Sequence, residues 1–288
     1  TPAYLATLQG RIDQDFPSPR CCVDHDCLVQ DKGRYAILTT LRSDDYLPLL
    51  EHLSCSIQHS NPGATLIVAT VEGDLSIEVS DRVKSLTNVQ LHLWKEFRIV
   101  NTLRSRFALN WVKLRAWEMD EYDMILMIDT DTLVLKDVSH LFKLPIHFAT
   151  VLDQDKNYAN YAALGRQQGG VELLRPCKAV AQHMMQLVSS NSTLQFSHSH
   201  AEQSFLDWYF RYDRWNLPIK YNAISHLLKD YGDHTAGGTA PVIVHYSVAK
   251  HYSMDLDPGL HHEQVIAMGC GKVVKEGQEG GQEVPQKR

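Results

Sequence analysis

The sequence predicts an α/β protein, a single domain with a mostly parallel sheet flanked by helices. Apolar runs of strand length alternate with segments of helical spacing through the first half of the chain, which is the pattern of a parallel sheet covered on both faces. The run Met124 to Ile128 is apolar at every position, as in a strand buried on both faces. The chain has 288 residues, 44% of them hydrophobic, which is enough for a sizeable core.

The first half supplies most of the regular elements. Ser43-Asp44-Asp45 offers an N-cap for a helix whose apolar residues extend from Tyr46 to Ile57, and Pro48 is tolerated in its first turn. A helix at Ala108 to Met119 should place on one face Leu109, Val112, Ala116 and Met119. The other expected elements are strands at Tyr35 to Thr40, Thr65 to Thr70 and Val89 to Trp94, and a helix at Ile77 to Leu86.

The second half is less regular. Its polar segment Asp153 to Gln168 indicates a long loop. Expected strands are His147 to Leu152, Gly170 to Leu174 and Pro241 to His245. Helices are expected after Pro176, through Val188, and at His200 to Phe210, with a flexible link at Gly232 to Gly238.

Composition divides the chain into three parts. Residues 1–32 are polar and proline-bearing without a clear period, which predicts an irregular N-terminal extension, and residues 33–268 hold the folded domain. Residues 269–288 have little to bury and are expected to be a flexible polar tail. The chain begins at Thr1 rather than Met, so we expect that a signal peptide or an anchor was removed upstream. The alternative is that the start reflects only where the chain was cut.

Charge and hydropathy exclude two classes of partner. The net charge is −6, from 28 basic and 34 acidic residues, which provides no basic footprint for nucleic acid. No apolar run approaches the roughly 20 residues that a membrane helix needs, so no transmembrane segment is expected in this chain.

Three of the six cysteines crowd into the segment Cys21 to Cys27, beside His25 and two aspartates. Their spacing does not match the paired C-x-x-C hooks of zinc sites, so disulfide bonding is favoured over a metal there. Asn191-Ser192-Thr193 is an N-glycosylation sequon. The cysteines, the sequon and the absent Met favour the lumen of the secretory pathway, the Golgi, and a cytoplasmic location is the alternative.

The most informative motif is Asp129-Thr130-Asp131, which directly follows the apolar run Met124 to Ile128 and precedes a second one, Leu133 to Leu135. Two carboxylates at i and i+2 at the carboxyl end of a buried strand can reach one hard cation together with phosphate oxygens. The alternative is a solvated turn. Acidic residues between two buried runs are costly unless they are paired or bind a metal, which favours a metal-phosphate site.

Several ordered blocks resemble the glycogenin-like family of retaining glycosyltransferases, which have the GT-A (Rossmann-like) fold. The strongest is WVKLRAWEMDEYDMILMIDTDTLVL, followed by SHLF. Further blocks in the family's order are YAILTT with a following Tyr, QGGVELLRP, the pair Glu202-Gln203, LPIKYN and VHYSVAKHY. The resemblance extends from Tyr35 to about Asp255, three quarters of the chain.

The resemblance implies a UDP-sugar donor and a manganese ion. Asp129 and Asp131 would hold the metal, with His245 as the third ligand. Without the resemblance, His245 would be interpreted as a histidine of the core. Lys113 and Lys250 would contact the diphosphate, and Arg104 would bind the donor. Without the resemblance, the three would be interpreted as ordinary surface charges.

The nucleotide and sugar contacts are carried over in the same way. The nucleotide would lie at Leu38, Thr39, Thr40 and Thr130, with Tyr46 stacked on uracil or, equally, packed in the core. The sugar would lie near Gln168, Gly169 and Gly170, which replace the family's Asn-Ser-Gly. The catalytic set would be Asp153, Glu202 and Gln203, with Glu202 where Asp is common.

The predicted function is metal-dependent transfer of a sugar from a UDP-sugar to a glycan or other hydroxyl acceptor with retention of configuration. Front-side attack is favoured, with double displacement through Glu202 or Asp153 as the alternative. The acceptor could also be inositol or a tyrosine of the protein itself. A homodimer is a candidate assembly.

Two rival functions remain. Val248 replaces a usual Gly and His251-Tyr252 a usual Pro-Trp, which with Gln168 suggests a non-catalytic nucleotide-sugar binder. A haloacid-dehalogenase-like phosphatase also has D-x-D after an apolar strand. In that class the motif opens the domain, and Thr or Val stands where this chain has Leu133.

Overall fold

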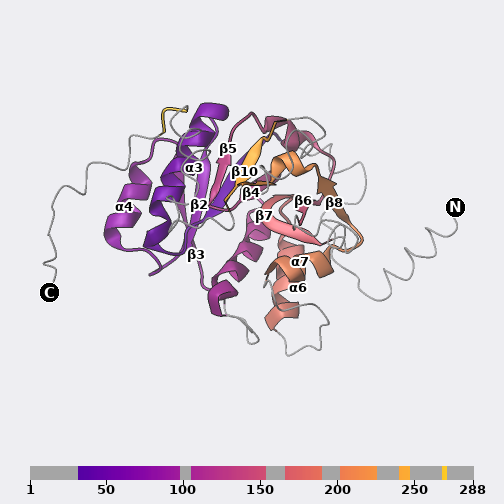
Figure 1. Ribbon diagram of the computed structural model, residues 1–288. Coiled ribbons are helices and arrows are strands. Elements are labelled where there is room, and N and C mark those ends of the chain that lie inside the picture. The colour runs from indigo at the N-terminus through magenta and orange to yellow at the C-terminus, as the bar shows by residue number, and fades with distance from the viewer. Residues whose placement is uncertain are drawn as a thin grey trace, which may run out of the picture.

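A seven-stranded sheet forms the centre of the protein, in a computed structural model that describes residues 32–97, 105–153, 166–189, 202–225, 240–246 and 268–270. The strand order is β3-β2-β1-β4-β7-β6-β8 (Figure 1). The strands are β1 Tyr35–Thr40, β2 Leu66–Val71, β3 Val89–Trp94, β4 Met124–Ile128, β6 Phe148–Leu152, β7 Gln167–Leu174 and β8 Arg214–Leu217. Only β7 runs antiparallel to its neighbours, β4 and β6, so the prediction of a mostly parallel sheet is confirmed.

Helices cover both faces of this sheet (Figure 1). One layer contains α3 Leu47–Ser60 and α4 Ile77–Ser85, and the other contains η2 Ser105–Glu118, α6 Lys178–Ser189 and α7 Glu202–Tyr209. Successive side chains of a strand point to opposite faces, so Ile37 packs in the α3 layer and Leu38 in the η2 layer. The short 3₁₀ helices are η1 Asp44–Tyr46, η3 Ser139–Lys143 and η5 Ile219–Tyr221.

A second, three-stranded sheet was not predicted. It comprises β5 Thr132–Val134, β10 Ile243–His245 and β9 Ala223–Ile224 in the order β5-β10-β9. β10 runs antiparallel to β5, with His245 opposite Thr132. This long-range pairing brings His245 next to the turn that follows β4.

Two predicted elements differ from the structure. The helix expected at Ala108 to Met119 is a 3₁₀ helix, Ser105–Glu118. It is buried nearly all round from Trp111 to Trp117, so it has no single apolar face; Leu109, expected in the core, is 44% exposed. Ser43 makes no capping hydrogen bond through its side chain, and α3 begins at Leu47 after η1, with Pro48 in its first turn as predicted.

Residues 154–165 of the expected loop lie outside the described residues, and its last two residues belong to a strand, because β7 begins at Gln167 rather than Gly170. Nε2 of Gln167 donates to the carbonyl of Gln203 (2.9 Å), and Nε2 of Gln203 donates to the carbonyl of Gln167 (2.7 Å). These two bonds tie Gln167 of the strand to Gln203 of α7, while Gln168 is buried with its Oε1 accepting from the N–H of Gly170 and from Asn222. The helix expected from His200 is α7, Glu202–Tyr209.

Some predicted features lie outside the described residues. These are residues 1–31, Arg104, the cysteine cluster, the sequon at Asn191, the link Gly232 to Gly238, Val248, Lys250, His251, Tyr252 and the tail beyond Cys270. Within the part of the chain that is described, no helix is both long and apolar enough to cross a membrane.

A disulfide joins Cys55 on α3 to Cys270, although Cys270 falls in the predicted tail. The side chain of Cys270 is buried and packs with Leu133 of β5 and Val244 of β10. The bridge therefore anchors this part of the chain against the small sheet that holds His245.

Removing this bridge should lower stability substantially. The double variant Cys55→Ala/Cys270→Ala should lose about 2–4 kcal/mol of unfolding free energy, because the bridge closes a loop of 215 residues and restricts the unfolded chain. Urea unfolding would measure the loss. Each single variant should lose as much as the double one, since either change breaks the bridge. An unfolding curve superimposable on that of the wild type would contradict this expectation.

Candidate metal centre and adjoining pocket

The turn Asp129-Thr130-Asp131 connects β4 to β5 and is held from three sides. The backbone N–H of Asp129 donates to the carbonyl of Gly170 (2.9 Å), and the carbonyl of Asp131 accepts from the N–H of Tyr246 (2.9 Å). The hydroxyl of Thr130 donates to the carbonyl of Thr40 (2.8 Å). The turn is thereby attached to β7, to the residue after β10 and to the end of β1.

Asp129, Asp131 and His245, the three residues that the resemblance implies as metal ligands, lie close together. Nε2 of His245 lies 3.2 Å from Oδ1 of Asp131 and 3.9 Å from Oδ2 of Asp129. The ligand atoms of the three residues all lie within 4.8 Å of one another. Donors placed about 2.1 Å from one ion are themselves about 3–4 Å apart, so the donor set and its spacing fit a divalent cation.

The imidazole of His245 is buried and oriented by its neighbours. Its Nδ1 lies 3.0 Å from Oδ1 of Asn222, and an Nδ1–H that donates there leaves Nε2 free as a ligand. Nδ2 of Asn222 and the N–H of Gly170 both donate to Oε1 of Gln168, which completes the network. Burial lowers the pKa of His245, but the carboxylates of Asp131 and Asp129 together outweigh it, so the net pKa is raised.

Lys113 is buried against the same turn. Its Nζ donates to Oδ1 of Asp129 (2.6 Å) and to the carbonyl of Gly169 (3.3 Å), and it lies 3.4 Å from Oε1 of Glu202. Burial opposes the charge on Lys113, yet nearby carboxylates, Asp129 first among them, raise its pKa above the usual range. Burial also raises the pKa of Glu202.

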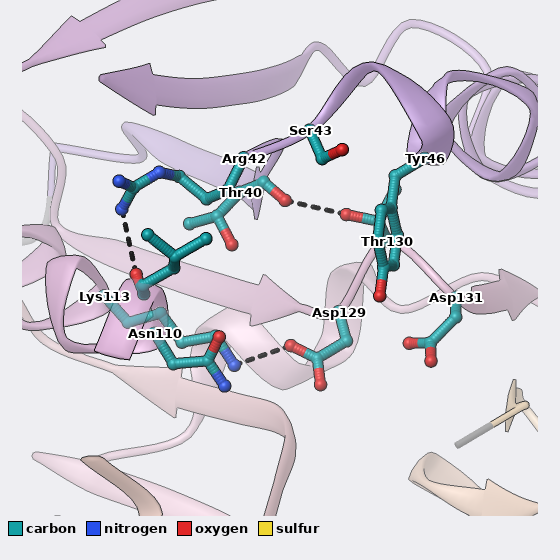
Figure 2. Close-up of a pocket in the computed structure, with 10 residues that line it drawn as sticks. Thr40, Arg42, Ser43, Tyr46, Asn110, Lys113, Asp129, Thr130 and Asp131 are labelled. Atoms are coloured by element: carbon teal, nitrogen blue, oxygen red, sulfur yellow. Dashed lines mark hydrogen bonds and ion pairs between the residues drawn. The ribbon is translucent and has the colours of Figure 1, made fainter. Parts of the chain in front are cut away.

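A pocket opens beside the metal centre, at the carboxyl ends of β1 and β4 (Figure 2). Its lining residues are Thr40, Arg42, Ser43, Tyr46, Leu109, Asn110, Lys113, Asp129, Thr130 and Asp131. Four predicted substrate residues are among them: Thr40, Tyr46, Lys113 and Thr130. In Figure 2 the hydroxyl of Thr130 faces the carbonyl of Thr40, and the Asp129 carboxylate faces Lys113. Ligands bind at this edge in open α/β sheets.

Other predicted residues lie around the pocket rather than in its lining. Leu38 is fully buried in the core, and the Thr39 hydroxyl is 3.2 Å from that of Thr130. Asp153 follows β6, where its N–H donates to the carbonyl of Arg166 (2.8 Å).

The remaining predicted residues lie along β7 and at the start of α7. Oε1 of Gln203 accepts from the N–H of Gly169 (3.1 Å), next to the buried Glu202. Gln168, expected near the sugar, has its amide Nε2 3.2 Å from Nδ1 of His245.

Sequence reasoning missed several side chains of this region. Arg42 and Asn110 line the pocket, and the guanidinium of Arg42 donates to the carbonyl of Leu109 (2.9 Å). Asn222 lies in the quoted block LPIKYN, but nothing local connects it to His245. Glu172 had a visible signal, since it is a carboxylate inside an apolar strand.

No family model matches the chain. Over 186 residues it is 26% identical to inositol phosphorylceramide glucuronosyltransferase 1 of Arabidopsis thaliana, a match that covers 62% of this chain and 31% of that protein. Over 140 residues it is 27% identical to galactinol synthase 1 of Solanum lycopersicum, covering 43% of each. Over 119 residues it is 28% identical to UDP-glucuronate:xylan alpha-glucuronosyltransferase 1 of Arabidopsis thaliana, covering 41% of this chain and 16% of that protein.

Solved structures give a broader match. The galactosyltransferase LgtC, solved with donor and acceptor sugar analogs, superposes with a TM-score of 0.59 and 15% identity, covering 84% of this chain and 98% of that one. The bifunctional glycosyltransferase WbbM superposes with a TM-score of 0.54 and 17% identity, and the match covers 76% of this chain and 46% of that one. The chain therefore has the GT-A fold of these enzymes. It spans less than half the length of the curated relatives named above.

Proposed function

We propose that this protein is a metal-dependent, retaining glycosyltransferase that moves a sugar from a UDP-sugar to a glycan or another hydroxyl acceptor. The observation that carries the proposal is the convergence of Asp129, Asp131 and His245 beside a pocket at the carboxyl edge of a GT-A sheet. The names of the relatives agree with it, since all are glycosyltransferases or galactinol synthases. The structural matches favour it over the phosphatase alternative.

In this proposal Asp129, Asp131 and His245 hold a manganese ion. When bound, the ion neutralises the negative charge of the diphosphate as UDP leaves. Lys113, at the pocket wall, adds a buried positive charge on the same side. Tyr46 offers its ring to the uracil, and Thr40 and Thr130 close the nucleotide side of the pocket. Arg104 and Lys250 are proposed as further donor contacts.

Front-side attack is the proposed route to retention. Glu202 is buried, and burial raises its pKa, which disfavours it as an exposed anionic nucleophile. Lys113 opposes this shift, but it lies 3.4 Å from Oε1 of Glu202 and engages that oxygen. Gln203 is engaged with Gly169 and Gln167, so it shapes the floor of the site. The named alpha-glucuronosyltransferase supports retention, because UDP-glucuronate carries its sugar in α linkage.

The donor is proposed to be UDP-glucuronate or UDP-galactose, with UDP-glucose and UDP-xylose as further candidates. UDP-glucuronate follows from the name of one relative, and galactose from the name of the galactosyltransferase LgtC. The names of the relatives also suggest inositol-containing or xylan-like acceptors. A glycogenin-like protein acceptor stays a prediction, as does a homodimer. An oxidising secretory compartment, the Golgi, is proposed because Cys55 and Cys270 form a disulfide.

A UDP-release assay over a panel of these four donors, with and without manganese, tests the proposal. We expect release with one donor in the presence of the metal and loss of that release when EDTA removes it. Myo-inositol and xylan oligosaccharides should be included as acceptors. Metal-independent release would contradict the role of the three ligands.

A non-catalytic binder is the second candidate. The observation that favours it is Gln168, whose Oε1 accepts from Asn222 and from the N–H of Gly170, so the side chain is held among protein groups. Manganese-dependent binding of UDP without release from any donor and acceptor pair would support this function. Turnover of a single UDP-sugar would exclude it.

A further inference from the structure

Glu172 is a buried carboxyl group without an assigned purpose. It lies on β7, opposite Met127 of β4 and Thr150 of β6, and is 0% exposed. Neither carboxylate oxygen has a hydrogen-bond partner among the residues that the structure describes. Such a group is expensive to bury, so its presence beneath a candidate active site calls for a functional reason.

Lys113 is the cation whose charge acts on Glu172, and its three N–H donors are already used. They face Oδ1 of Asp129 (2.6 Å), the carbonyl of Gly169 (3.3 Å) and Oε1 of Glu202 (3.4 Å). Glu172 interacts electrostatically with Lys113 but accepts none of these three donors. Oε2 of Glu202 also lacks a partner within the described part of the chain.

Among the acceptors of Lys113, Asp129 is also a proposed metal ligand. It is the closest partner of Lys113 and also one of the three proposed ligands of the cation. A cation bound there draws the charge of Asp129 toward itself and repels the ammonium group next to it. The carboxylates of Glu202 and Glu172 are then the groups that can balance the charge of Lys113.

We propose that Glu172 is a positioning residue of this site: with Glu202, it balances the charge of Lys113 when Asp129 binds a divalent cation. The inference rests on the metal centre of the proposed function. It assigns Glu172 no contact with the substrate, and it explains why the apolar strand β7 contains a carboxylate.

The charges around Glu172 agree with this role. Burial raises the pKa of Glu172 to about 8, against the opposing effect of Lys113 and with further increases from Glu202 and Asp129. The group is therefore protonated at neutral pH without a metal, and it gains charge as the pH rises through about 8. A cation that occupies Asp129 leaves Lys113 in need of that charge.

Manganese binding to the full chain tests the inference, measured by isothermal titration with Mn²⁺ alone and then with UDP present. Glu172→Gln keeps the shape and removes the charge, and should weaken Mn²⁺ binding about tenfold. Its thermal unfolding midpoint should stay near the wild type. Between pH 7 and 8.5 the wild type should gain more Mn²⁺ affinity than the variant. Glu51→Gln is the matched control. It removes a carboxylate on α3 that is paired with Arg82 of α4, and it should leave the Mn²⁺ affinity unchanged.

A second pair of variants separates positioning from general damage. Glu172→Leu should weaken Mn²⁺ binding while raising the metal-free unfolding midpoint, because it removes an unpartnered buried polar group. Lys113→Met/Glu172→Leu removes both charges and should regain the Mn²⁺ affinity lost in Glu172→Leu. A merely structural role for Glu172 would produce neither the opposite signs nor the recovery.

Two outcomes overturn the inference, and they are distinguishable. If Glu172→Gln binds Mn²⁺ within about twofold of the wild-type affinity, the role of Glu172 is overturned and the proposed metal centre stands. Absence of Mn²⁺ binding by the wild type, with and without UDP, overturns both the metal centre and the role of Glu172.

Discussion

Asp131→Asn is expected to reduce manganese-dependent UDP release about a thousandfold. Oδ1 of Asp131 lies 3.2 Å from Nε2 of His245, on the side where the cation would be held. An amide loses the negative charge and is a poorer ligand, and its NH₂ group can face the imidazole in place of an acceptor. The assay is UDP release at saturating donor over a range of Mn²⁺ concentrations, together with Mn²⁺ titration of the variant.

Asp123→Asn is the matched control for this loss. Asp123 lies at the opposite, amino end of β4, where its carboxylate accepts from the N–H of Arg34 (2.9 Å) and pairs with the guanidinium of Arg34 (3.1 Å). Its replacement should lower the unfolding midpoint but leave the turnover of the folded protein near that of the wild type. Equal losses of turnover in the two variants would show that Asp131 acts through stability rather than through the metal.

Gly170→Ala is expected to be the second most damaging change, about a hundredfold in Mn²⁺ affinity. A Cβ built at this position overlaps the imidazole of His245 and lies 2.8 Å from Oε1 of Gln168. Both neighbours are buried and held by Asn222, so His245 must leave its place beside Asp131. Mn²⁺ titration and UDP release would both report the displacement.

Gly169→Ala provides the comparison for this glycine. Its added Cβ would meet Oε1 of Gln203 at 3.3 Å, and that flexible amide can shift by a few tenths of an ångström. We therefore expect Gly169→Ala to affect Mn²⁺ affinity far less than Gly170→Ala does. If the two variants lose Mn²⁺ affinity equally, the displacement of His245 is not the cause.

Local patterns were sufficient for the framework of the site. The apolar run of β4 and the two aspartates after it are adjacent in the chain, so one short segment encodes both the buried strand and the acidic turn. The alternation of strands and helices in the first half likewise follows from periods of two and 3.6 residues. The same reasoning failed at η2, because a helix buried nearly all round shows no polar face. It also failed at Gln167, because the amide N–H of this residue donates to a carbonyl 36 positions away.

The role of His245 could be predicted from the sequence only in part. Its sequence context suggested a ligand only through the resemblance of several ordered blocks, since a histidine after an apolar strand is more often part of the core. The pairing of β10 with β5 places it opposite Thr132 and thus beside Asp131. Contacts between segments more than a hundred residues apart leave no periodic trace in the sequence.

By itself, the sequence determined the α/β architecture, the buried strand β4 and the acidic turn with a divalent cation as its expected ligand. Only the tertiary structure decided the charge arrangement around that turn: Lys113 paired with Asp129 and Glu202, Glu172 left without a donor, and Asn222 against His245. The physical reason is that strand and helix periods are local, whereas burial and electrostatic pairing depend on which distant groups share one desolvated volume.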